Sequence, residues 1–169
     1  MADYNKYYPK AFNLEGKVYE DDARDVGGCT KYGITLYDVR LFHRNDDLNC
    51  DAVKALDDAS AAEILKKLYW DYYEADSIEN QSLAEFLVDS RLNQGNIITR
   101  YIQEILGVTV DGIFGQHTLA AIQAHNPKEL FDKLHDKRLQ RYLDIINNNP
   151  SQIVFKNGWM NRLNAIKFS

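Results

Sequence analysis

Glu15 is the residue whose type and position most suggest chemistry in this chain. It stands at the expected end of a helix, and a glycine-punctuated segment with the pattern of a β-hairpin follows it. A carboxylic acid that gives a proton to the oxygen between two sugars needs a fixed, partly apolar position. A helix end that faces a hairpin across a cleft provides such a position. These residues therefore predict a glycan hydrolase.

Hydrolysis of a glycosidic bond also needs a second group, which attacks the anomeric carbon or positions the attacking water. Three carboxylates follow closely, and they belong to Asp21, Asp22 and Asp25. The hydroxyl of Thr30 could instead orient a water molecule. An aspartate before two glycines also makes an effective turn, and a β-branched threonine suits a strand without any function. Asp25 and Thr30 are the catalytic candidates, and the choice between them stays open.

Four further residues are candidates for binding the glycan. Gly28 would keep the hairpin thin enough for a polymer to lie close to its backbone. Tyr32 is the tyrosine most readily assigned to the cleft, where an aromatic face could stack on a sugar ring. The amides of Asn93 and Gln94 could contact N-acetyl groups, although an amide beside a glycine also suits the end of a helix.

The elements that must position these residues begin with one helix and one hairpin. Helical spacing predicts a helix from about Tyr4 to Glu15, with Ala11 and Phe12 on the buried face and Gly16 at the stop. From Lys17 to Thr35, glycines and β-branched or aromatic residues between acidic turn residues predict short strands and a tight turn. This is the one convincing β segment in the sequence.

Helical signals dominate the rest of the chain. A capping-box pattern begins at Ser60, and Gly95 and Gly107 fall where two helices should stop. The pair Asn126-Pro127 predicts the start of a long helix. The segment from Asp111 to Thr118 is a turn pattern, which suits packing between two helices better than binding of a polymer. The expected fold class is mainly α (α+β), with one small β-hairpin after the first helix.

The composition is typical of a soluble globular domain. The 169 residues are 45% hydrophobic and 27% charged, which makes disorder a poor expectation. The net charge of −5 gives no basic surface for nucleic acid, so we expect no nucleic-acid partner. No stretch is long and apolar enough for a secretory signal or a membrane span. We therefore expect synthesis in the bacterial cytoplasm, without a signal peptide, and no stable membrane insertion.

Cys29 and Cys50 are the two cysteines of the chain. Two cysteines in a chain of this size are more typical of reduced thiols than of a disulfide framework, so we expect no bridge. Cys29 and a histidine could instead form the nucleophile and base of a peptidase, although no local motif supports the pairing. The histidines are His43, His117, His125 and His135. No spacing of cysteine and histidine resembles a zinc site, and we expect no metal or cofactor.

Four groups of residues, in the same order along most of the chain, resemble the signature of glycoside hydrolase family 108, long labelled secretion-activating proteins. The first is Glu15-Gly16 with Asp25-Val26-Gly27-Gly28-Cys29-Thr30 and Gly33-Ile34-Thr35; the others are Asn93-Gln94-Gly95, Val110 to Leu119, and Gly158-Trp159-Met160-Asn161-Arg162. Two positions depart from the family pattern. Lys17 stands where a second glycine is usual, and Val26 replaces a proline.

The resemblance implies a lysozyme-like fold and cleavage of the bond between N-acetylmuramic acid and N-acetylglucosamine in bacterial peptidoglycan. It implies that Glu15 is the catalytic acid, and the layout of Glu15 and Thr30 also resembles that of tailed-phage lysozymes. The expected organisation is a single lysozyme-like domain over residues 1–169. Within it, residues 1–90 form the catalytic part, and residues 91–169 form a peptidoglycan-binding helical part packed on it.

Two biological readings remain open at this point. A muramidase made without a signal peptide would need a holin or another export route, in phage-type lysis or in secretion, before it acts on the cell wall. The alternative is a noncatalytic module that binds peptidoglycan or assists secretion. Trp159 and Arg162 are expected to be packing residues in either case.

Overall fold

The computed structural model describes residues 1–21 and 28–169, which form two compact units. One unit is Asp3–Asp76, and the other is Met1–Ala2 with Ser77–Ser169. Nine α-helices and one two-stranded antiparallel sheet occur in the described part of the chain. The prediction of a mainly α, lysozyme-like fold with one small hairpin after the first helix is confirmed.

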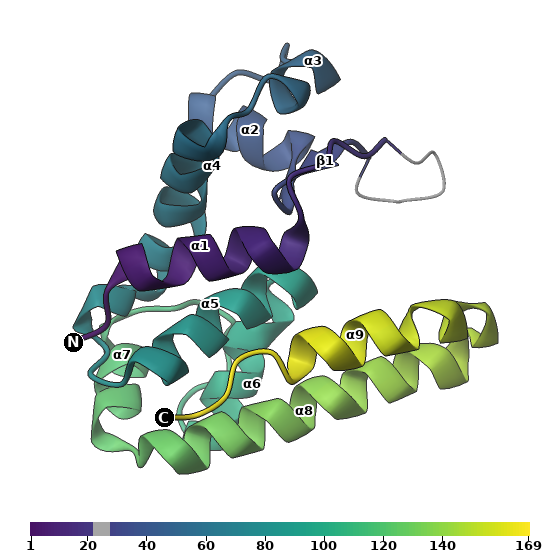
Figure 1. The fold of residues 1–169 in the computed structure, drawn as a ribbon. Helices are drawn as coiled ribbons and strands as arrows, with labels where there is room; N and C mark the ends of the chain where they lie inside the picture. Colours follow the sequence, from purple (N-terminus) through teal and green to yellow (C-terminus); the bar gives the residue numbers. More distant parts are fainter. Residues whose placement is uncertain (22–27) are drawn as a thin grey trace. The chain divides into compact units, whose positions relative to one another are not determined.

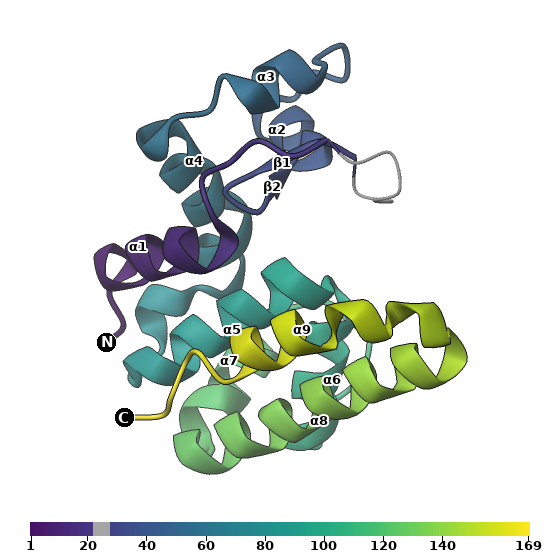
Figure 2. The same ribbon diagram turned by 45° about the vertical axis from the view of Figure 1, so that its right-hand side comes forward.

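The unit Asp3–Asp76 contains the first helix, the hairpin and three further α-helices (Figures 1 and 2). The elements are α1 (Tyr4–Glu15), β1 (Thr30–Lys31), β2 (Ile34–Thr35), α2 (Leu36–His43), α3 (Cys50–Lys54) and α4 (Asp58–Leu65). A π-helical turn, η1 (Lys66–Trp70), and a 3-10 turn, η2 (Asp71–Tyr73), continue α4 directly. The hairpin packs against α2, α3 and α4, so helices support the strands that follow Glu15.

Aromatic side chains form much of the core of this unit. The rings of Tyr7 and Trp70 stack at 5.6 Å between centroids, and the hydroxyl of Tyr4 donates to the carbonyl of Ala62. Tyr7 and Trp70 are both fully buried. These contacts fix α1 on the segment formed by α4 and η1, and α1 carries Glu15 as its last residue.

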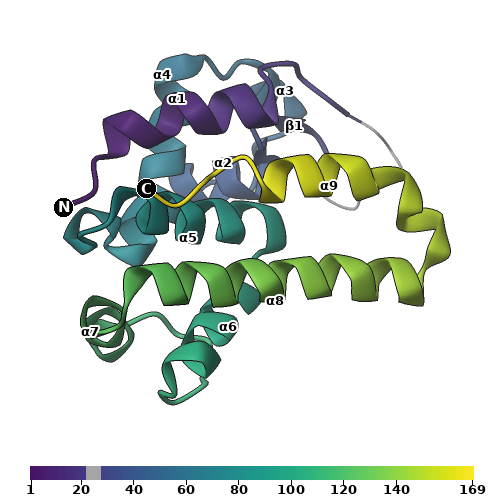
Figure 3. The ribbon, with the colours of Figure 1, turned by 60° about the horizontal axis from the view of Figure 1, so that its bottom comes forward.

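The second unit is entirely helical in its regular structure. After η3 (Ala75–Ser77) come α5 (Gln81–Gln94), α6 (Ile97–Leu106), α7 (Gln116–Ala124), α8 (Pro127–Asn148), η4 (Pro150–Phe155) and α9 (Lys156–Leu163). The long helix α8 contacts α5, α6, α7 and α9, and Figure 3 shows α8 and α9 side by side, joined through η4. The ring centroids of Phe86 and Phe131 lie 4.3 Å apart in this core.

Local signals account for several boundaries of these helices. The side chain of Asn126 accepts a hydrogen bond from the amide of Glu129 at the start of α8, and Pro127 occupies the first turn, as predicted. Gly95 and Gly107 end α5 and α6 with positive φ. Along the described residues, no helix combines the length and the apolar character that crossing a membrane would require.

Candidate functional site

Glu15 occupies the last position of α1 because the helix is capped at both ends. The side chain of Asp3 accepts from the amide of Asn5 at the start. At the end, the amide of Gly16 donates to the carbonyl of Phe12 at 3.0 Å, with φ of +81° at the glycine. A residue other than glycine would be strained at this φ. Glu15 is therefore held at a defined helix end, with its residue surface partly exposed.

The hairpin places a tight turn next to this helix end. Thr30 pairs with Thr35, and Lys31 pairs with Ile34, which leaves Tyr32 and Gly33 as the two central residues of the turn. Their φ values are +58° and +75°. Positive φ at both central residues is the requirement of a type I′ turn, whose twist matches that of the flanking strands.

Gly33 brings the turn into direct contact with Glu15. A β-carbon at position 33 would lie 2.6 Å from Cδ of Glu15 and 2.7 Å from its Cγ. Such separations are far shorter than van der Waals contact, so the carboxylate side chain fills the space that a larger residue would need. The turn thus contacts the helix end directly at Gly33, which is a further residue beside Glu15, and the predicted cleft between helix end and hairpin stays a prediction.

The side chain of Tyr32 is buried and does not lie on an open surface, although Tyr32 is a central residue of the turn. Its residue surface is 5% exposed, and its ring packs on that of Phe12 with centroids 4.8 Å apart. Its hydroxyl donates to Oδ1 of Asp58 at 2.7 Å, and this hydrogen bond, with burial, raises the pKa of Tyr32 to about 12. Stacking of Tyr32 on a sugar stays a prediction, and the buried ring does not favour it.

Thr30 is anchored on both sides by its backbone. Its amide donates to the carbonyl of Glu20 at 2.8 Å, the amide of Glu20 donates back at 2.9 Å, and Thr30 pairs with Thr35 on its other side. Thr30 as a whole residue is partly exposed. Its role in orienting water stays a prediction.

Two other predicted residues lie beside the hairpin in the sequence. Gly28 is exposed and has φ of +69°, and no atom of the described residues lies within 4 Å of the place that a β-carbon would take there. Asp25 lies outside the described residues, as does Asp22. The second catalytic group is therefore still a prediction.

The prediction of two reduced cysteines is wrong. Cys29 and Cys50 form a disulfide with their α-carbons 5.9 Å apart, and Cys29 is 1% exposed. The bridge joins the residue before β1 to the first residue of α3, and folding brings these residues together across a sequence separation of 21. A bridged, buried sulfur cannot act as the thiolate of a peptidase. The alternative based on Cys29 therefore fails for this structure.

Asn93 and Gln94 lie near the end of α5 in the second unit. The amide of Asn93 donates to the carbonyl of Asp89 at 2.8 Å, and that of Gln94 donates to the carbonyl of Arg138 at 3.4 Å. The Asn93 side chain thus bonds within α5, and the Gln94 side chain joins α5 to α8; the amide of Gly95, and neither of these side chains, makes the cap hydrogen bond at the C-terminal end of α5. Their contact with N-acetyl groups stays a prediction.

The loop between α6 and α7 is held by one buried glutamine. Gln103 is 1% exposed; its Nε2 donates to Oδ1 of Asp111 at 2.7 Å, and its Oε1 accepts from the amide of Gly112 at 2.8 Å. Hydrogen bonds from the Ile113 amide and from Gln103 lower the pKa of Asp111. The prediction of a turn in this segment is confirmed as far as Gly115, since α7 begins at Gln116; the preference for helix packing over binding of wall polymer stays a prediction.

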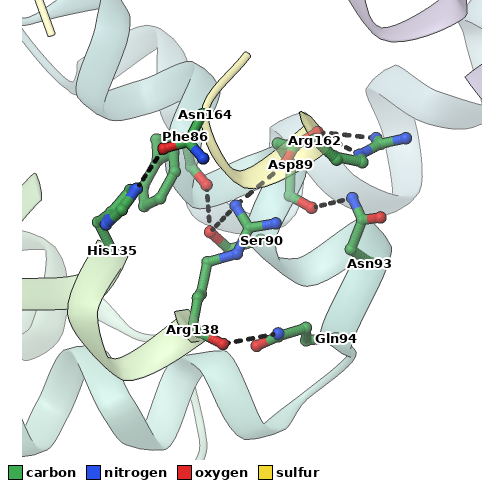
Figure 4. A network of polar contacts seen from close by, with 9 residues as sticks. All are labelled: Phe86, Asp89, Ser90, Asn93, Gln94, His135, Arg138, Arg162 and Asn164. Atoms are coloured by element: carbon green, nitrogen blue, oxygen red, sulfur yellow. Dashed lines mark hydrogen bonds and ion pairs between the residues drawn. The ribbon is translucent and has the colours of Figure 1, made fainter. Parts of the chain in front are cut away.

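A buried ionic network joins three helices of the second unit (Figure 4). Asp89 on α5 accepts from Arg138 on α8 at 3.0 Å and from Arg162 on α9 at 2.7 Å. Arg138 also donates to the hydroxyl of Ser90 at 3.0 Å and lies 4.8 Å from the ring centroid of Phe86. The prediction that Arg162 packs the fold is confirmed.

Trp159 on α9 has a comparable structural role. Its ring stacks on Tyr142 with centroids 4.9 Å apart and on Phe155 at 5.9 Å.

Within residues 1–21 and 28–169, no group of three or more His, Cys, Asp or Glu side chains is placed to hold a metal ion.

Comparisons with known proteins divide the chain in a similar way to the sequence motifs. Residues 8–95 match the family model described as Glycosyl hydrolase 108, and residues 98–164 match the one described as Predicted Peptidoglycan domain. The chain is similar to a solved structure titled "Structure of Brucella abortus SagA", with a TM-score of 0.81 and 27% sequence identity, over 96% of this chain and 90% of that chain. No curated protein sequence matches the chain.

Proposed function

The chain belongs to the glycosyl hydrolase 108 family, and from this premise we propose that it is an N-acetylmuramidase with Glu15 as its catalytic acid. Membership of this family supports glycoside hydrolase activity, and the match of residues 98–164 to a predicted peptidoglycan domain supports action on peptidoglycan. The proposal concerns the bond that is cut, the residues that cut it and the biological setting.

The observation that carries the proposal is the position of Glu15. It is partly exposed at the end of α1, and its side chain fills the space against Gly33 in the hairpin turn. A general acid must be fixed within reach of the leaving oxygen, and a side chain packed between a helix end and a turn has few alternative positions. Of the predicted site residues that the structure describes, Glu15 has the placement that suits this role best.

The proposed reaction is hydrolysis of the bond between N-acetylmuramic acid and N-acetylglucosamine. Glu15 gives its proton to the bridging oxygen as the bond from that oxygen to the anomeric carbon of the muramic acid breaks. Water adds its oxygen to the anomeric carbon, and the proton that it loses passes to a base or to solvent. Glu15 regains a proton before the next turnover.

Either Thr30 or Asp25 is proposed to place the attacking water. Thr30 lies in β1, whose partner strand follows the turn that contacts Glu15. Asp25 precedes Gly28 in the sequence and would supply a carboxylate in the position that the family motif assigns to it. Gly28, where no atom of the described residues lies within 4 Å of the place that a β-carbon would take, is proposed to let the glycan lie close to the hairpin backbone.

The disulfide bears on the setting in which the enzyme works. Disulfides persist in oxidising compartments outside the cytoplasm, and Cys29–Cys50 ties the hairpin to α3. This supports action on the wall after release from the cytoplasm. Release through a holin in phage-type lysis, or by a secretion system, stays a prediction from the sequence.

Analysis of digested peptidoglycan by mass spectrometry tests the proposal. New reducing ends on N-acetylmuramic acid would support it, and reducing ends on N-acetylglucosamine would contradict the bond assignment. New amino termini would indicate a peptidase. A protein that sediments with sacculi but releases no product would be the noncatalytic binding module, which is the alternative function.

A further inference from the structure

The hairpin is tied at successive residues to the segment that joins α3 to α4. Nζ of Lys31 donates to the carbonyl of Lys54 at 3.0 Å and also to that of Leu56. The next residue, Tyr32, donates its hydroxyl to Asp58, the first residue of α4. The segment from Lys54 to Asp58, which is distant from the hairpin in the sequence, thus stabilises the turn that contacts Glu15.

Asp58 joins both sides of the site through its two carboxylate oxygens. Oδ1 accepts from Tyr32 at 2.7 Å, and Oδ2 accepts from Nζ of Lys17 at 2.5 Å. Tyr32 directly precedes Gly33, and Lys17 is the second residue after Glu15. One carboxylate therefore links the chain just after the catalytic acid to the turn that packs on that acid.

We propose that Asp58 is a positioning residue for the catalytic acid, which acts through Tyr32 to hold Gly33 against Glu15. This inference rests on the proposed function, since it assigns a role in the reaction of Glu15. Asp58 is proposed to act indirectly, through its hydrogen bond with Tyr32, and not by contact with Gly33 or with the glycan. It fixes the turn, and the turn fixes the rotamer of the acid.

The two hydrogen bonds that Asp58 accepts differ in the solvent exposure of their donors. The side chains of Lys17 and Asp58 are 51% and 59% exposed, and ion pairs of this kind contribute little because water and salt screen them. The bond from Tyr32 starts on a ring that is buried against Phe12, which restricts its alternatives. The hydrogen bond between Tyr32 and Asp58 should therefore dominate the positioning.

Both partners stay in the required protonation state around neutral pH. Hydrogen bonds from Lys17 and Tyr32 lower the pKa of Asp58, so its carboxylate is charged. The same bond raises the pKa of Tyr32, so its hydroxyl keeps its proton. Titration of this pair does not interrupt the contact in the range where a wall hydrolase works.

The test measures hydrolysis of purified sacculi by the full chain and its variants. Tyr32→Phe and Asp58→Ala each remove the hydrogen bond, and each should lower kcat about tenfold while KM changes less than about twofold, since a misplaced acid slows the chemical step more than binding. Lys17→Met should lower kcat less than either. Asp47→Ala is the matched control, because Asp47 is an exposed aspartate of the same unit, and it should behave as wild type.

A double variant separates positioning from general stability. If Tyr32 and Asp58 act through their mutual hydrogen bond, the double variant Tyr32→Phe with Asp58→Ala should lose no more kcat than the worse single variant. Multiplied losses, unchanged kcat in both single variants, or losses that follow only the melting temperature would overturn the inference. If wild type releases no reducing ends, the proposed function fails as well; if it does and the variants match it, the inference alone fails.

Discussion

The side chain of Glu15 lies against the α-carbon of Gly33, and the space between them does not admit a β-carbon. An added β-carbon would lie 2.6 Å from Cδ of Glu15 and 2.8 Å from its Oε1. The glycine also has φ of +75°, which side chains with a β-carbon rarely adopt. Two independent constraints thus require glycine at this point of the hairpin turn.

Gly33→Ala should therefore displace the side chain of Glu15, the proposed catalytic acid. We expect a loss of sacculus hydrolysis of about 100-fold, because a shift of about 1 Å in a reacting group has an effect of that order. Gly107→Ala is the matched control, since Gly107 has φ of +68° with open space around it. It should lose about 1–2 kcal/mol of stability from backbone strain and keep its activity. Full activity of Gly33→Ala would contradict the positioning account.

Reduction of the disulfide should destabilise the protein. The bridge joins Cys29 and Cys50 across a sequence separation of 21. Removal of a cross-link that closes a loop of this size lowers the free energy of unfolding by about 2–4 kcal/mol. Thermal melts with and without dithiothreitol measure the effect. The variant with serine at both positions should melt at the lower temperature and should not respond to the reductant. Equal melting of wild type in both conditions would disprove the prediction.

Asp89→Asn should lower the free energy of unfolding of the second unit more than any substitution of a surface residue. Asp89 is 1% exposed and Arg138 is 0% exposed, so the substitution leaves buried guanidinium charge without its carboxylate. Breaking a buried ion pair in this way costs about 3–5 kcal/mol. Denaturant unfolding of the variant and wild type measures the difference.

The matched control for Asp89 is Glu104→Gln. Glu104 pairs with Lys137, and their side chains are 43% and 38% exposed. A pair in this setting contributes about 0–1 kcal/mol, because solvent screens it. Equal costs for the two substitutions would show that the Asp89 network is not a main source of stability.

The hydroxyl of Tyr32 should titrate later than an ordinary phenol. Its hydrogen bond to Asp58 raises its pKa from 10.0 to about 12, so its protonated form is favoured by the fold. The stability that it contributes is present below pH 10 and is lost as pH rises toward 12. The difference in phenolate absorbance between wild type and Tyr32→Phe should grow above pH 11. A difference already complete at pH 10 would contradict this assignment.

The boundaries of α1 and α8 could be predicted from sequence because they depend on local signals. Helical spacing, Gly16 after Glu15 and the pair Asn126-Pro127 act within a few residues of the chain. The start of α4 is a case where two local patterns compete. The capping box predicted at Ser60 begins instead at Asp57, and Ser60 is its third helical residue.

Contacts between residues far apart in sequence could not be predicted in this way. Neither the disulfide nor the bond from Tyr32 to Asp58 leaves a periodic pattern, since each depends on how α3 and α4 return to the hairpin. The same holds for Asp89, which meets Arg162 only through the packing of α5 and α9. Family motifs identified Glu15, but the glycine contact that fixes its side chain required coordinates.

The central claim is that Glu15 supplies the proton that releases the leaving sugar, and Glu15→Gln tests it most directly. The amide has nearly the same shape, so the variant should melt like wild type and still sediment with sacculi. Mass spectrometry should find at least about 100-fold fewer new reducing ends on N-acetylmuramic acid, as removal of a general acid requires. A folded Glu15→Gln protein that releases these ends at the wild-type rate would contradict the account.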